Sequence, residues 1–184
     1  MKRFSGASAC VIAIVCAGSQ VSAADSDPLL EVSIHVRATV AGPEIVAART
    51  VAAKLFAAAG VRIIWHEEDA PDAPVRRPTV VLVSSSREMD AAMGSRLTLG
   101  RVVQPRVRAY VHYDRVVQMA RDFHLDRGML LGQVIAHEIG HLLLGAAHTV
   151  DGVMAPTIDR RQIPVVTFSR DQADALRATL SVLQ

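Results

Sequence analysis

The segment HEIGHLLLGAAH at residues 137–148 constrains this chain more than any other feature. His137 and His141 are four residues apart, and on a helix this spacing places both side chains on one face, where a single metal ion can contact both. Glu138 leans to one side of the pair, where it can reach a metal-bound water without binding the metal itself. The spacing therefore predicts a helical metal site with a candidate general base beside it.

The third histidine requires the helix to end before it. His148 follows His141 by seven residues, and a continued helix would carry it about 10.5 Å further along the axis. Zinc holds imidazole nitrogens at about 2.0–2.1 Å, so three rings that share one ion must converge. We expect Gly145 to end the helix in the left-handed conformation, which glycine adopts without steric cost.

The rest of this helix is apolar on nearly every face, counted from a predicted N-cap at Asp126. Such a helix is buried. Burying His137, Glu138 and His141 without partners would cost several kcal/mol in total, whereas a metal and its water would satisfy all three.

An acidic residue could also supply the third ligand. No glutamate follows Glu138, which excludes a downstream glutamate ligand, and Asp151 is the nearby aspartate. Its place before Gly152 favours a role in a turn. The alternative for His148 is a histidine in a surface loop. We expect the remaining histidines to be ordinary surface or core residues, namely His35, His66, His112 and His124.

Residues 1–23 have the pattern of a signal peptide. Lys2 and Arg3 precede an apolar run at residues 9–17, and the small-residue ending Val21-Ser22-Ala23 suits cleavage after Ala23. The apolar run is shorter than the roughly 20 residues of a membrane span, although an uncleaved anchor is the alternative. We therefore expect a secreted or periplasmic protein, with one domain at residues 24–184 and no membrane attachment after cleavage.

Composition narrows the partners and the chemistry. The two cysteines, Cys10 and Cys16, would leave with the signal, so the mature chain can form neither a disulfide nor a thiolate metal site. The formal net charge is +2, and the basic residues are scattered, so nucleic acid is not an expected partner. The sequence does not indicate an oligomeric state.

Hydrophobic periodicity predicts an α+β (α/β-like) domain, in which a buried metal-binding helix packs against a mixed sheet of four to five strands. The loop at residues 67–78 contains three prolines. The expected strands are residues 29–40, 61–66, 79–84, 97–103 and 106–113. The expected helices besides the metal-binding one are 42–59, opened by Gly42-Pro43-Glu44 and ended by Gly60, then 87–93, 114–123 and 169–183, the last capped by Ser169.

These motifs resemble the metzincins, whose signature is HExxHxxGxxH followed by a turn that contains methionine. His137, His141 and His148 fall on the three ligands, Glu138 on the base and Met154 on the methionine turn, and residues 148–156 look like the matrixin form of that turn. This chain has one more residue between the second histidine and the glycine than the signature, HxxxGxxH in place of HxxGxxH. The longer form looks like that of small secreted bacterial matrixin-like proteins.

The resemblance implies a metzincin-like single domain with a C-terminal helix after the methionine turn. It also implies a secreted endopeptidase with one catalytic Zn²⁺, a zinc-activated water and Glu138 as general base. Met154 would be a hydrophobic floor beneath the ligands. The partner would be a peptide or protein substrate, bound along the strand at residues 97–103.

A second interpretation is a secreted zinc-binding or interaction module on a metzincin scaffold, with weak or absent proteolysis. The intact Glu138 argues against it, because a degenerate enzyme can keep its ligands for stability alone after it has lost the base.

Overall fold

The computed structural model describes residues 27–67, 77–84, 99–103, 107–157 and 166–183. The expected signal peptide at residues 1–23 and the expected helix at 87–93 lie outside these ranges. Within them, no helix is both long enough and apolar enough to cross a membrane.

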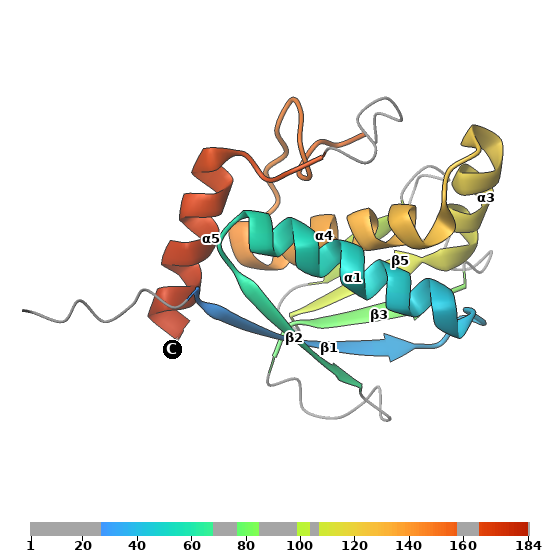
Figure 1. The fold of residues 1–184 in the computed structure, drawn as a ribbon, viewed down its shortest axis with the longest axis horizontal. Coiled ribbons are helices and arrows are strands. Elements are labelled where there is room, and N and C mark those ends of the chain that lie inside the picture. Colours follow the sequence, from blue (N-terminus) through green and yellow to red (C-terminus); the bar gives the residue numbers. More distant parts are fainter. Residues whose placement is uncertain (1–26, 68–76, 85–98, 104–106, 158–165, 184) are drawn as a thin grey trace, which may run out of the picture.

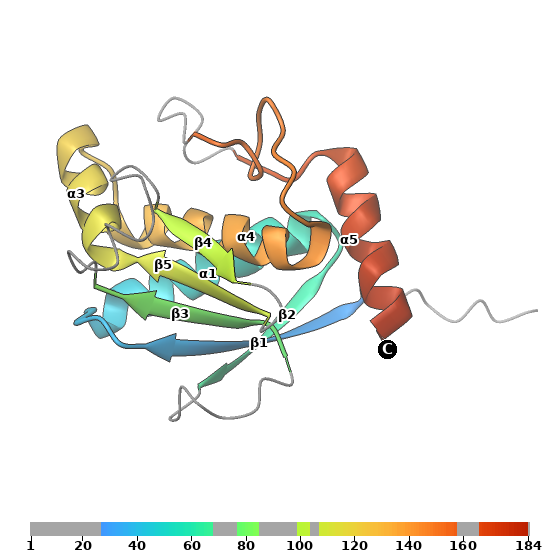
Figure 2. The ribbon, with the colours of Figure 1, turned by 180° about the vertical axis from the view of Figure 1, so that it is seen from behind.

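A five-stranded mixed sheet forms one layer of the domain, as the sequence predicts (Figures 1 and 2). Its order is β2-β1-β3-β5-β4, and β4 is antiparallel to β5 whereas the other neighbours are parallel. Among the described strands, β4 is therefore an edge strand. The bounds are β1 (Leu29–Val36), β2 (Arg62–Glu67), β3 (Thr79–Val83), β4 (Gly100–Val103) and β5 (Arg108–His112).

Buried apolar side chains alternate with others along β1, and the buried ones mark the face of the sheet that meets the helices. Leu30, Val32 and Ile34 point into the hydrophobic core, and Glu31 between them is exposed. The strand ends at Val36 rather than at residue 40, where the sequence pattern placed its end. The apolar pattern continues beyond the strand because Ala38 is still buried.

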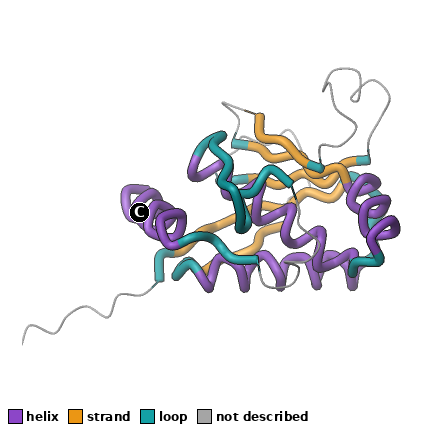
Figure 3. Tube along the Cα trace, turned by 90° about the horizontal axis from the view of Figure 1, so that it is seen from above, coloured by secondary structure: helices purple, strands orange, loops and turns teal. Residues whose placement is uncertain are grey.

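Helices α1 (Gly42–Ala58) and α4 (Arg127–Leu144) lie side by side across one face of the sheet (Figure 1). In the view from above, the strands are drawn in orange and the helices in purple (Figure 3). The two helices approach closely because α4 presents glycines at their contact. A Cβ built on Gly132 would lie 2.6 Å from the Ala48 carbonyl oxygen, and one on Gly128 would lie 2.6 Å from the Ala47 Cβ.

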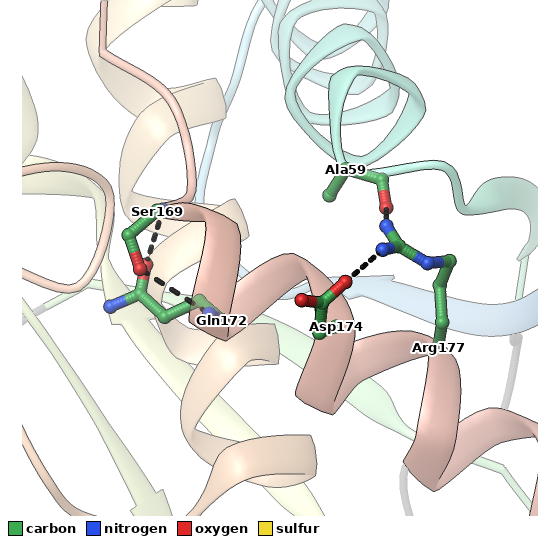
Figure 4. A network of polar contacts seen from close by, with 5 residues as sticks. All are labelled: Ala59, Ser169, Gln172, Asp174 and Arg177. Carbon is green, nitrogen blue, oxygen red and sulfur yellow. Dashed lines mark hydrogen bonds and ion pairs between the residues drawn. The ribbon is translucent and has the colours of Figure 1, made fainter.

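Among the described residues, α3 (Tyr113–Phe123) and α5 (Arg170–Leu183) lie at opposite ends of α4 (Figures 1 and 2). Helix α5 begins at a reciprocal cap. The Ser169 backbone N–H donates to the Gln172 side-chain oxygen at 2.9 Å, and the Gln172 N–H donates to the Ser169 hydroxyl at 3.3 Å (Figure 4). The cap that the sequence predicts at Ser169 is thereby confirmed.

Arg177 fastens α5 to the rest of the domain. Its guanidinium donates to the Ala59 carbonyl oxygen at 2.6 Å, just beyond the end of α1, and pairs with Asp174 on its own helix (Figure 4). A cation near a helix C-terminus also interacts favourably with the helix dipole. The contact joins the last helix to the turn between α1 and β2.

Candidate metal centre

Helix α4 carries His137 and His141, the first two predicted metal ligands. Asp126 caps its start by accepting the Met129 N–H at 2.8 Å, as the sequence predicts. The helix is buried along most of its length, including Glu138, Ile139 and Gly140. The N-cap and the burial of α4 hold the helix in place without a bound metal.

His137, His141 and His148 converge at the C-terminal end of α4. The Nε2 atom of His141 lies 2.9 Å from that of His137 and 3.2 Å from that of His148. Their ligand atoms all lie within 4.8 Å of one another, and the described residues contain no other such group of three or more histidine, cysteine or acidic side chains. The structure thus brings the three predicted ligands together.

Backbone carbonyls hold the other ring nitrogens of the two helical histidines. Nδ1 of His137 lies 2.7 Å from the Val153 oxygen, and Nδ1 of His141 lies 2.9 Å from the Gly145 oxygen. A carbonyl can only accept, so each Nδ1 carries the proton and each Nε2 presents its lone pair to the cluster. Such partners fix the tautomer and orientation of histidine ligands in metal sites.

Gly145 ends the helix as predicted, but its conformation differs from the expected left-handed one. Its φ of 88° and ψ of −171° lie in a region that only glycine occupies readily. The chain leaves the helix in an extended direction instead of curling back, and this carries His148 to the other two histidines. A side chain at Gly145 would meet no atom within 4 Å, so the backbone conformation alone calls for glycine.

Met154 packs against Gly140, which lies between the two helical histidines in the sequence of α4. Its side chain is 1% exposed, and a Cβ built on Gly140 would lie 2.4 Å from the Met154 sulfur. Phe168 closes the same contact from the segment before α5. Met154 is thus a buried apolar contact of the helix segment that carries both histidines, and its close approach depends on Gly140, whose role the sequence interpretation missed.

The side chain of Glu138 projects from α4 against the edge strand β4. Its side chain is 4% exposed, and within the described residues its Oε2 atom has no hydrogen-bond partner. Gly100 of β4 packs directly on it, because a Cβ there would lie 2.5 Å from Oε1. Burial raises the pKa of Glu138 to about 8, so a proton remains on this carboxyl near neutral pH unless a positive charge lies nearby.

The electrostatics of the histidines favour the neutral form that a metal requires. Burial lowers the pKa of His137 to about 4, and the neighbouring His141 and His148 add to this effect. Burial also lowers the pKa of His141. Both rings are therefore neutral at pH 7 and can act as nitrogen donors.

These residues fit a zinc ion. Three neutral imidazoles are a common zinc donor set, and ligand nitrogens about 2.05 Å from a tetrahedral ion lie roughly 3.3 Å apart. The observed Nε2 separations of 2.9 and 3.2 Å are close to this value. The set supplies three protein ligands, which is the number found in catalytic rather than structural zinc sites.

Asp151 is exposed, and its side chain does not belong to the convergent group in the part of the chain that the structure describes. Its backbone oxygen accepts the Thr149 hydroxyl at 2.7 Å, and Gly152 after it has a φ of 79°. The turn role predicted for Asp151 agrees with this geometry. His35, His66, His112 and His124 likewise lie outside the group.

Comparisons with known proteins agree with the geometry. A family model described as Matrixin matches residues 83–179, more than half of the chain. The crystal structure of an archaemetzincin from Methanopyrus kandleri is similar, with a TM-score of 0.53 and 13% identity over 83% of this chain and 96% of that one. At this identity the likeness shows the fold, and it confirms the metzincin-like architecture. A search of curated proteins finds no match.

Proposed function

This chain belongs to the matrixin family of metzincin zinc peptidases, and from that premise we propose that it is a secreted zinc-dependent endopeptidase. His137, His141 and His148 would hold one zinc ion, and Glu138 would act as the general base. The observation that carries the proposal is the convergence of three histidine Nε2 atoms beside a buried carboxyl on the same helix.

When bound, zinc supplies a Lewis acid that makes water a stronger acid and polarises a substrate carbonyl. The chain's own residues would do the rest. The ionised Glu138 carboxylate would take a proton from the attacking water and give it to the leaving amine. A positive charge held by the histidines favours that ionised form, against the effect of burial.

The proposed substrate is an extended peptide. Strand β4 is paired on one side only among the described strands, so its other edge can accept the backbone of a peptide by strand addition. Gly100 brings this strand against the Glu138 carboxyl. A peptide on β4 would therefore lie next to the proposed base.

Two measurements test the proposed activity. Purified protein should contain about one zinc per chain, and Glu138→Gln should abolish cleavage of a peptide library while zinc remains bound. Glu67→Gln, at the exposed end of β2, is the matched control and should cleave normally. If the wild type binds zinc but cleaves nothing, the chain is instead a zinc-binding module.

The ligand assignment has its own test. His148→Ala should weaken zinc binding by at least tenfold, whereas Asp151→Ala should leave it unchanged. The reverse pattern would transfer the third ligand to Asp151.

Secretion rests on the sequence of residues 1–23. Expression of the full chain in a host with a general secretory pathway should yield an exported protein that begins near Ala24. Retention of the full-length chain in a membrane fraction would instead support an uncleaved anchor.

A further inference from the structure

Thr149 fastens the loop that carries His148. Its hydroxyl donates to the Asp151 oxygen at 2.7 Å, and its backbone N–H donates to the Met154 oxygen at 3.0 Å. The same hydroxyl accepts the Gln172 side-chain N–H at 3.1 Å. One residue next to the third histidine therefore joins its own turn, the methionine turn and helix α5.

Gln172 is a rigid anchor for this contact. It is 8% exposed, and its side-chain oxygen is already held by the Ser169 N–H in the cap of α5 (Figure 4). The helix itself is fixed by the buried Leu176 and Leu180 and by Arg177 at the end of α1. The amide of Gln172 thus has one end in the helix cap and the other on the Thr149 hydroxyl.

His148 needs such support more than the other two histidines do. It is exposed, and within the described residues its Nδ1 atom makes no hydrogen bond. His137 and His141 are held by the helix and by backbone carbonyls. Apart from its contacts with the other two histidine rings, the support for His148 in the described part of the chain comes through the backbone of the loop that carries it.

We propose that Gln172 and Thr149 are positioning residues that hold His148 in place for the metal. This inference rests on the proposed zinc site. The hydrogen bond between them would keep the exposed loop in the geometry in which the third imidazole meets the other two. Its loss should speed the release of zinc while the fold remains intact.

Two substitutions remove this bond in different ways. Thr149→Val keeps the shape of the side chain and removes the hydroxyl. Gln172→Glu keeps the acceptor that caps α5 but loses the amide donor, and its carboxylate could accept the Thr149 hydroxyl only if that hydroxyl gave up the Asp151 oxygen. Each should raise the rate at which zinc passes from the loaded protein to a chromogenic chelator by about tenfold.

Three further variants separate positioning from stability. Thr149→Ser retains the hydroxyl and should release zinc at the wild-type rate. Ser181→Ala, which removes a hydroxyl bonded to the Ala178 oxygen elsewhere on α5, should also leave the rate unchanged. In a His148→Ala background, Thr149→Val should have no additional effect, because the residue that it positions is gone.

The outcomes distinguish this inference from the proposed function. Wild-type release rates in both Thr149→Val and Gln172→Glu would overturn it, as would an equal acceleration in the His148→Ala background. If one variant fails to fold, as judged by circular dichroism, the other still decides. A wild type that binds zinc and cleaves no peptide overturns the proposed peptidase alone, and one that takes up no zinc overturns both.

Discussion

The buried carboxyl of Glu138 should make the metal-free protein less stable as pH rises. Burial raises the pKa of this group from 4.5 to about 8, so between these values the folded chain binds a proton that the unfolded chain does not. Stability is then lost with increasing pH, by about 1.4 kcal/mol for each pH unit. Between pH 6.5 and 8 the expected loss is about 2 kcal/mol.

Glu138→Gln should remove this dependence. Because the variant carries no titratable group at this position, its free energy of unfolding should change little between pH 6.5 and 8. The pKa values of His137 and His141 are lowered in the folded state, so partial protonation of these residues in the unfolded chain near pH 6.5 gives a small rise in stability with pH. This rise is the same in the wild type and in Glu138→Gln, so the difference between the two slopes reports Glu138. For a chain of this size, 2 kcal/mol corresponds to a shift of roughly 4–8 °C in Tm.

The assay is urea unfolding of chelator-treated protein, followed by circular dichroism at several pH values. The wild type should lose stability with pH, and Glu138→Gln should not. Glu67→Gln removes a carboxylate whose side chain is 75% exposed and should retain the wild-type slope. Parallel curves for the wild type and Glu138→Gln would refute the reasoning, because Glu138 would then not be held in a charge-excluding environment.

Four other outcomes follow from the packing and the site. Gly140→Ala should lower the unfolding free energy by about 1–3 kcal/mol in urea titrations and weaken zinc binding, since its Cβ would lie 2.4 Å from the Met154 sulfur; an unchanged midpoint would contradict this contact. Gly132→Ala should cost a similar energy through the Ala48 oxygen, 2.6 Å away, yet leave zinc content normal, and a zinc-depleted variant would argue against a purely structural effect. Gly145→Ala should cost about 1–3 kcal/mol because of its backbone conformation, and calorimetry showing no loss of Tm would mean that the helix exit tolerates other residues. Removal of zinc by a chelator should lower the Tm of the wild type, and an equal Tm with and without metal would show that the folded state does not bind it preferentially.

Much of the fold could be predicted because local patterns agree with tertiary packing. Alternation in residues 29–36 marked β1, and Asp126 and Ser169 marked the starts of α4 and α5 through hydrogen bonds that are local in sequence. His137 and His141 could be found for the same reason, since helical spacing relates them, whereas His148 was assigned through the resemblance to the metzincin signature. The end of β1 was less accurate because Ala38 remains buried beyond the strand.

The contacts that complete the site could not be read from spacing. Gly100 meets Glu138 across separate elements, and Gln172 meets Thr149 across 23 residues. Such pairs depend on how the sheet and helices pack together. Gly140 did carry a signal, because a glycine inside a buried helix weakens the helix unless a close contact requires it. The conformation of Gly145 was predicted with the right sign of φ but the wrong region.

The hydrogen bond from Arg177 to the Ala59 oxygen spans 118 residues of sequence. Closing so large a loop has an entropic cost that grows slowly with its length, and such long-range contacts slow folding. Helix α5 is also synthesised after the other described elements, so a chain emerging from the ribosome contains both helical histidines before the cap at Ser169 can form. Assembly of the complete centre is thus a late step of folding, and a truncation within α5 should weaken the support of His148 through the contact between Gln172 and Thr149.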